Sequence, residues 1–153
     1  MNIDNVRKQL EVDEGVVYEI YKDHLGFLTF GIGHLVLDTD PEYGFCEGHA
    51  VEPERVVEAF ERDIATAVDE CAKLYRDWDD LPEEVQEILV NMLFNLGRPR
   101  LRKFKKMNKA IESHDWRLAS IEGADSLWYH QVGARAERLM TRLRGCYKPL
   151  SDQ

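Results

Sequence analysis

Apolar residues recur at helical spacing along most of the chain, and the first such run begins near the N-terminus. Asn2 or Asp4 can cap the helix that this run predicts, since both side chains accept hydrogen bonds from free backbone N–H groups. Gly15 is expected to end the helix, because glycine commonly follows the last helical residue. The apolar positions follow an i, i+3, i+7 pattern and are Ile3, Val6 and Leu10.

The pattern changes between residues 16 and 36. The segments 16–23, "VVYEIYKD", and 27–36, "FLTFGIGHLV", are rich in β-branched and aromatic residues, and "HLG" separates them. This composition predicts a small antiparallel hairpin or meander. Residues 38–50 contain proline, glycine and several acidic residues, and they predict an irregular loop.

Helical spacing returns at residue 53 and predicts one helix of more than five turns. Pro53 suits the first helical position, where a backbone N–H has no partner within the helix. One apolar stripe is expected along this helix, made of Val56, Val57, Phe60, Ile64, Ala67, Val68, Cys71 and Leu74.

A second strongly apolar helix is predicted over residues 85–96. Asp80 is interpreted as its cap and Pro82 as a residue near its start, while Gly97 is expected to end it. Further helices are predicted around residues 103–112, 115–122 and 134–144.

These elements predict an α+β fold in which a small N-terminal hairpin or meander lobe is joined by a long helix to an all-helical C-terminal lobe. We expect one domain over residues 1–153. Its small lobe covers about 13–55, its connecting helix 53–76, and its helical lobe combines 77–153 with the helix at 2–13. A crevice between two such lobes is where a site is expected.

Composition narrows the class of protein. Hydrophobic residues make up 44% of the chain and charged residues 32%, as in an ordinary globular domain. No apolar run is long enough to form a signal peptide or to span a bilayer, so we expect no membrane insertion. The three cysteines, Cys46, Cys71 and Cys146, fit neither a zinc pattern nor a disulfide framework and are expected to be free thiols.

The formal charge of −9 is divided unevenly along the chain. Residues 97–153 contain 13 basic and 6 acidic residues, a formal charge of +7, and residues 1–96 therefore carry −16. The extreme is "GRPRLRKFKKMNK", residues 97–109, with seven basic groups and no acid. This segment is either a solvated helical face or the part of the chain that meets an anionic partner.

Two carboxylates, Glu14 and Asp23, flank the first predicted strand. On residue type alone they are either ordinary solvated charges or a pair that faces one bond across a cleft. Around them, five blocks of sequence resemble, in order, the phage-type lysozymes of glycoside hydrolase family 24, most closely the T-even coliphage lysozymes. The blocks are Glu14-Gly15, "IYKDHLGFLTFGIGHL", "FERDIATAV", "VNMLFNLG" and "SLWYHQVGARAERL".

The resemblance implies a catalytic set of three residues. Glycosidic hydrolysis needs one carboxylic acid to protonate the leaving oxygen and a second carboxylate to act at the anomeric carbon. Glu14 matches the family's acid, Asp23 its partner carboxylate, and Thr29 a hydroxyl that helps to hold the attacking water. The family's inverting outcome implies that Asp23 positions or activates water, with the carboxyl groups about 6.5–9.5 Å apart.

The resemblance also assigns supporting residues. His34 matches a histidine that pairs with an acid on the long helix, here Asp63, and such a pair raises the pKa of the histidine. Asn91 lies inside an apolar helix and is expected to make a buried hydrogen bond. Arg135 matches an arginine that reaches the catalytic glutamate, although a cation there favours the ionised carboxylate.

Other matched positions concern the substrate. Leu35 and Phe94 match positions that bind sugar, whereas Trp128 and Gln131 are assigned mainly to core packing and the shape of the cleft. The sequence departs from the family at two C-terminal positions. Met107 and Glu122 stand where relatives often carry small polar groups that contact substrate.

The resemblance therefore implies a monomeric muramidase without cofactor or metal. It would cleave the bond between N-acetylmuramic acid and N-acetylglucosamine for bacterial lysis, and as a phage endolysin it would stay in the host cytoplasm until release. Three alternatives are a non-catalytic peptidoglycan-binding module, a transglycosylase, and a helical nucleic-acid binder that uses residues 97–109. The acidic N-terminal part and the lack of a stacking-aromatic motif argue against nucleic acid.

Overall fold

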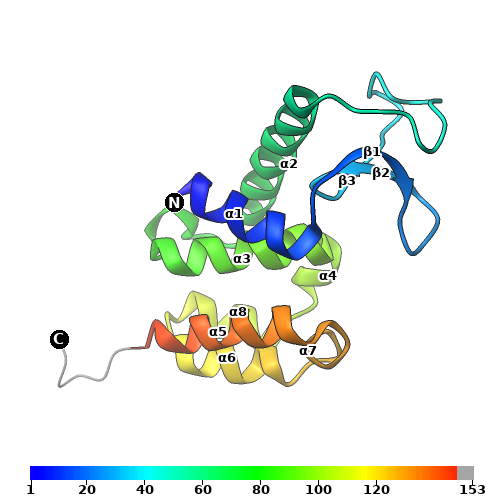
Figure 1. The fold of residues 1–153 in the computed structure, drawn as a ribbon. Helices are drawn as coiled ribbons and strands as arrows, with labels where there is room; N and C mark the ends of the chain where they lie inside the picture. The colour runs from blue at the N-terminus through cyan, green and yellow to red at the C-terminus, as the bar shows by residue number, and fades with distance from the viewer. Residues whose placement is uncertain (148–153) are drawn as a thin grey trace. The chain divides into compact units, whose positions relative to one another are not determined.

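The computed structural model describes residues 1–147, so the end of the predicted domain, residues 148–153, lies outside the described part. The described chain forms two compact units, one of residues 4–66 and one of residues 1–3 together with the chain from residue 67 onward. Both α-helices and an antiparallel sheet are present, which confirms the predicted α+β class (Figure 1).

The unit of residues 4–66 begins with helix α1, Ile3–Glu14. Val6 and Leu10 are buried as their spacing predicts, while Ile3 is 38% exposed and lies outside the core. Gly15 has a φ of +76°, a conformation that costs glycine little, and it ends the helix directly after Glu14. The sequence therefore fixes the position of Glu14 at the C-terminal end of α1.

Three short strands follow α1 and form an antiparallel sheet in the order β1-β2-β3. Their bounds are Val17–Lys22 for β1, Leu28–Gly31 for β2 and His34–Leu35 for β3. Thr29 on β2 is paired with Tyr21 on β1 and with Leu35 on β3. Directly paired residues lie on the same face of a sheet, so these three side chains share one face.

The segment from residue 36 to 52 contains turns and no named strand, in agreement with the predicted loop. It is held to β1 by an isolated bridge between Glu19 and Ala50, and by two backbone hydrogen bonds of Ile20, to His49 and from Gly48. The loop is thus attached to the sheet along its C-terminal part.

Helix α2, Pro53–Leu74, begins at the predicted residue and ends slightly before the predicted end at residue 76. Most of its apolar stripe is buried, including Val56, Phe60 and Cys71. Val57 is 42% exposed, so the stripe is narrower than predicted. Because Val57 follows Val56 directly, it lies about 100° around the helix and away from the buried side.

Helix α3, Glu83–Leu96, is the most buried helix, and Gly97 ends it as predicted. The assignment of Asp80 as its cap is wrong. Asp80 belongs to a short 3-10 helix, Trp78–Asp80, and the residue at the N-cap position is Pro82. A proline there gives no side-chain cap, because it has no hydrogen-bonding side chain.

Two of the helices that follow α3 were not predicted: α4, Arg98–Arg102, and α7, Leu127–Val132. The predicted ones are α5, Lys105–Glu112, α6, Trp116–Ala124, and α8, Ala134–Gly145. In Figure 1, α5, α6 and α8 lie side by side, and α6 packs against both of the others. Gly123 allows this close packing, because a Cβ there would meet the sulfur atoms of Met107 and Met140.

Candidate active site

The Glu14 carboxyl group lies against the backbone of Gly33. A Cβ atom built on Gly33 would be 3.1 Å from Oε2 of Glu14 and 3.4 Å from its carboxyl carbon. Gly33 also has a φ of +64°, a conformation that side chains rarely adopt. The turn between β2 and β3 therefore leaves the space into which the carboxyl group of Glu14 fits.

Asp23 follows β1 and is fixed by the turn that leads to β2. Its Oδ1 atom accepts hydrogen bonds from the N–H groups of Leu25 and Phe27, both at 2.9 Å. Its own N–H donates to the Phe27 carbonyl at 2.9 Å, which closes the turn. Among residues 1–147, no hydrogen bond engages the Oδ2 atom, so one carboxylate oxygen anchors the turn and the other can accept a further hydrogen bond.

Thr29 is buried, with 4% of its surface exposed, and its hydroxyl donates to the Phe27 carbonyl at 3.0 Å. The single hydroxyl hydrogen is used in this bond, so the oxygen offers only lone pairs to any other partner. A water molecule next to Thr29 would therefore have to donate a hydrogen to it. Asp23 and Thr29 are tied to the same residue, Phe27, and so have fixed positions relative to each other.

The Tyr21 phenol interacts electrostatically with the carboxylates of both Glu14 and Asp23. Burial raises the pKa of the Tyr21 phenol, and the negative charges of Glu14 and Asp23 raise it further. Coulombic interaction falls with distance, so both carboxylates lie near the Tyr21 ring. Tyr21 is also the cross-strand partner of Thr29. The structure thus brings the three predicted catalytic residues together around Tyr21, which sequence reasoning missed.

The predicted contact between His34 and Asp63 is present. His34 Nδ1 lies 2.7 Å from Asp63 Oδ2, and its Nε2 lies 2.7 Å from Asp40 Oδ2, a second partner that was not predicted. A carboxylate faces each ring nitrogen, and the ring can donate to both only when both nitrogens carry hydrogen, so this arrangement favours the cationic form. Burial opposes this charge, but the hydrogen bonds to Asp63 and Asp40 outweigh burial and raise the pKa of His34, as predicted.

Arg55 continues this network toward the loop. Its guanidinium group forms two hydrogen bonds of 2.8 Å to the Glu42 carboxylate and one of 3.2 Å to Asp40 Oδ1. Burial would raise the pKa of Asp40, but hydrogen bonds from the Leu37 N–H and His34 lower it, and Arg55 lowers it further. Two acids of the 38–50 loop are therefore tied to β3 and α2 through His34 and Arg55.

Asn91 has the buried hydrogen bond that its position predicts. The residue is fully buried on α3, and its Oδ1 accepts a hydrogen bond of 2.9 Å from Nε of Arg135. Arg135 also donates to the Asn91 carbonyl at 3.3 Å. This pair connects α3 with the start of α8 and fixes the direction of the Arg135 side chain.

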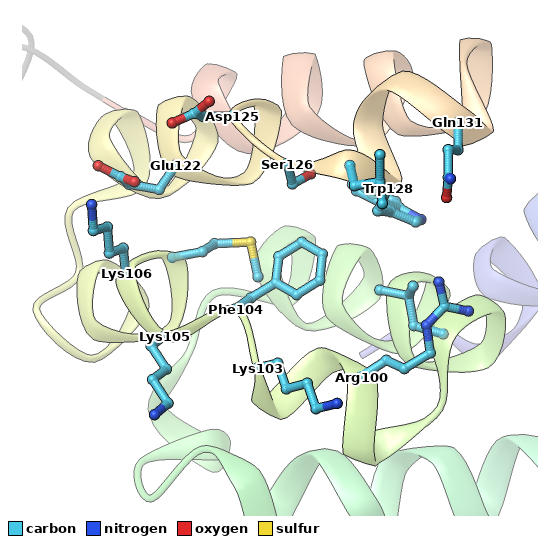
Figure 2. A pocket seen from close by; sticks show the side chains of 13 residues that line it. Arg100, Lys103, Phe104, Lys105, Lys106, Glu122, Asp125, Ser126, Trp128 and Gln131 are labelled. Carbon is cyan, nitrogen blue, oxygen red and sulfur yellow. The ribbon is translucent and has the colours of Figure 1, made fainter.

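The remaining predicted residues differ in exposure. Leu35 is 44% exposed on the sheet face that carries Thr29, while Phe94 is partly buried on α3. Trp128 is buried and its indole N–H donates to Asn95 Oδ1 at 2.8 Å, as the packing role predicts. Gln131 is exposed and lines a hollow of about 550 Å³ in the helical unit (Figure 2).

Two residues that depart from the family pattern line the same hollow. Met107 is buried and Glu122 is partly exposed. Among residues 1–147, no group of three or more histidine, cysteine or acidic residues has a geometry that could hold a metal ion. None of the helices in that range is both long enough and apolar enough to cross a bilayer.

Comparison with known proteins gives consistent matches. A family model described as "Phage lysozyme" matches residues 11–144. "Probable T4-type lysozyme 2" from Dictyostelium discoideum is 32% identical over 91% of this chain and 93% of its own length. "Probable T4-type lysozyme 1" from the same organism is 26% identical, with the same two shares. "Peptidoglycan hydrolase gp36" of Pseudomonas phage phiKMV is 28% identical over 91% of this chain but only 15% of its own length.

Proposed function

The chain belongs to the phage lysozyme family and is a lysozyme-type peptidoglycan hydrolase, and we propose that it cleaves the β-1,4 bond between N-acetylmuramic acid and N-acetylglucosamine with inversion. The stereochemistry follows from the roles that Glu14, Asp23 and Thr29 take in this proposal, and the bond follows from the family resemblance. The observation that carries it is geometric: the Glu14 carboxyl group lies against the turn at Gly33, and Asp23 and Thr29 are both hydrogen-bonded to Phe27.

In this proposal Glu14 donates a proton to the oxygen that leaves the anomeric carbon. A general acid must be held within hydrogen-bond reach of that oxygen. The end of α1 at Gly15 and the contact with Gly33 restrict the Glu14 carboxyl group to one place. Proton donation produces the free hydroxyl group of the leaving sugar as the bond to the anomeric carbon breaks.

Asp23 and Thr29 hold the attacking water. The Oδ2 atom of Asp23 accepts one hydrogen of the water, and the Thr29 oxygen accepts the other, because the Thr29 hydrogen is already bound to the Phe27 carbonyl. With both hydrogens engaged, the water directs a lone pair toward the anomeric carbon. Asp23 then takes up the proton that the water loses, which balances the proton given by Glu14.

The remaining residues of the proposal bind substrate or support the acid. Leu35, on the face of Thr29, and Phe94 offer apolar surface to the sugar rings. The side-chain direction of Arg135 is fixed by Asn91, and we propose that its positive charge influences the pKa of Glu14. If it does, Arg135→Met raises the pH at which activity is lost on the alkaline side, since removing a cation favours the protonated acid.

Peptidoglycan is the substrate and the main partner in this proposal, and the protein acts as a monomer without nucleic acid or membrane insertion. A phage endolysin of this kind would remain in the host cytoplasm until release to the wall.

The sugar found at the new reducing ends of the glycan shows which bond the protein cleaves. Purified peptidoglycan is digested with the protein, reduced with borohydride and hydrolysed, and the reduced amino sugar is identified. Cleavage of the proposed bond gives reduced muramic acid. Reduced glucosamine would show that the other glycosidic bond is cut, and 1,6-anhydromuramic acid would show transglycosylation. Release of no new ends, with binding retained, would mark a non-catalytic wall-binding module.

A further inference from the structure

A continuous row of exposed basic side chains lies on α4, α5 and the turn between them. The row, which we call the cationic strip, consists of Arg100, Lys103, Lys105, Lys106 and Lys109. These residues line two hollows of about 550 Å³ and 310 Å³, which share Lys106 and Glu122 in their linings. In Figure 2, four of the five come from one wall of the larger hollow, and Glu122 and Asp125 come from the opposite wall.

The side chains of the strip form no ion pair within the described residues, although Glu122 and Asp125 line the opposite wall of the larger hollow. Within residues 1–147, none of its five side chains is in a salt bridge or a side-chain hydrogen bond, whereas other surface cations, such as Lys73 with Asp69, are paired. Lys105 and Lys109 are four residues apart on α5, a spacing at which like charges repel. A row of unpaired cations on a protein of net charge −9 favours an anionic partner at this surface.

We propose that the cationic strip binds a linear phosphodiester polymer of polyol units, an anionic wall polymer distinct from the glycan strand that is cleaved. This proposal rests on the proposed function in one respect: a peptidoglycan hydrolase meets such a polymer at the bacterial wall. Bound in this way, the polymer would keep the enzyme on the wall between cleavage events.

The chemistry of the strip is compatible with phosphate groups. Four of its five residues are lysines, and an ammonium group binds phosphate as a compact point charge with three donors. The larger hollow is also lined by the partly exposed Phe104 and the exposed Leu127, which offer apolar contact to the carbon chain of a polyol. The two hollows share Lys106 and Glu122, so an extended chain could place successive phosphates along the strip from one hollow to the other.

Two other polyanions fit this surface less well. Single-stranded nucleic acid needs several exposed aromatic faces on which successive bases stack, but the lining of the larger hollow has one partly exposed ring, Phe104, and Trp128 is only 3% exposed. An anionic bilayer presents a flat surface, whereas the strip lines hollows whose other wall carries Glu122 and Asp125. The acids on that wall repel a sheet of anionic headgroups but leave a single chain free to follow the lysines.

Binding of poly(glycerol phosphate), freed of peptidoglycan and lipid, tests the proposal. The dissociation constant is measured for the full chain over a range of salt concentrations. The charge-reversal variant Lys103→Glu/Lys106→Glu is compared with Lys8→Glu/Lys73→Glu, which makes the same change in net charge at exposed lysines elsewhere. We expect the strip variant to bind at least about tenfold more weakly and to show a salt slope lower by about 1–2. The control should change affinity about twofold or less.

The outcomes separate this proposal from others. Equal weakening by both variants would show that only net charge matters, and no binding at low salt would also overturn the proposal. Tighter strip-dependent binding of poly-glutamate, of a single-stranded oligonucleotide or of phosphatidylglycerol vesicles would assign the strip to those partners instead. The uncharged variant Lys103→Gln/Lys106→Gln, whose thermal unfolding is measured alongside, controls for misfolding caused by the charge reversal. None of these probes is cleaved by a muramidase, so the result is independent of the proposed hydrolysis.

Discussion

The Oε2 atom of Glu14 lies 3.1 Å from the position that a Cβ atom on Gly33 would occupy. The residue at the end of α1 and the turn between β2 and β3 are thus fitted to each other, although 19 positions separate them in the sequence. The contact explains why the turn needs glycine for a second reason besides its backbone conformation. It also makes the position of the Glu14 carboxyl group sensitive to a single methyl group.

Gly33→Ala should therefore reduce activity by more than its effect on folding. The added methyl group displaces the Glu14 carboxyl, and a shift of about 1 Å at a catalytic group can cost about 100-fold in rate. Gly44→Ala is the matched control, because Gly44 has a φ of +89° and open space around it. Both variants should lose roughly 1 kcal/mol or more of stability. Equal kcat values in the two would show that Gly33 matters only to the backbone.

Replacing Thr29 tests the water site. Thr29→Val keeps the shape of the side chain but removes the oxygen that accepts a hydrogen from water, and kcat should fall by about 100-fold. Thr29→Ser keeps the hydroxyl and should retain most of the activity. The comparison requires kcat on purified peptidoglycan together with the unfolding temperature of each variant. Similar rates for valine and serine would remove Thr29 from the mechanism.

The His34 network predicts how stability depends on pH. The pKa of His34 is raised by folding, so its contribution is complete below about pH 6.5, the ordinary histidine value, and is lost as pH rises through the raised pKa. The pKa of Asp40 is lowered, so its contribution is present above about pH 3.9 and is lost as pH falls through the lowered pKa. Stability from this network should therefore be greatest at about pH 4–6.5.

His34→Asn measures that contribution. The variant leaves the carboxylates of Asp40 and Asp63 without the cation between them, and it should lose about 3–5 kcal/mol near pH 6. The deficit should shrink as pH rises through the raised pKa of His34, where the native ring loses its proton. His24→Asn, at an exposed histidine, is the control. A deficit that does not change with pH would contradict a cationic His34.

Asn91→Leu tests the support of Arg135. The leucine removes the Oδ1 atom that accepts the hydrogen bond from Nε, so a partly buried guanidinium loses an acceptor, at a cost of about 1–3 kcal/mol. Denaturant unfolding of the variant measures this cost. Asn108→Leu serves as a comparison, since Asn108 also makes two side-chain hydrogen bonds, to Tyr75 and to the Leu101 carbonyl, but none to Arg135. Activity should fall in the first variant only.

Sequence reasoning predicted the long elements better than the short ones. Pro53 and the terminal glycines of α1 and α3 are local signals, and they gave the correct start of α2 and the correct ends of α1 and α3. Helices α4 and α7 have five and six residues, fewer than two turns, so apolar spacing cannot define them. Their formation depends on packing within the helical unit.

The same limit applies to the candidate site. Glu14, Asp23 and Thr29 were assigned through family resemblance, since residue type alone left solvated charges as an alternative. Asp40 was missed, because an acid in an irregular loop has no sequence signal that distinguishes a buried partner of His34 from a surface charge. Tyr21 was missed because its part in the site follows from strand register, not from its own residue type.

The central claim is that Glu14 supplies the proton for glycosidic cleavage. The most direct measurement is the rate at which outer-membrane-stripped bacteria are cleared by the native protein, by Glu14→Gln and by Glu11→Gln, one turn earlier on α1. We predict that Glu14→Gln stays folded and loses at least about 100-fold in rate, while Glu11→Gln clears the cells like the native protein. Clearing by folded Glu14→Gln at the native rate would contradict the claim.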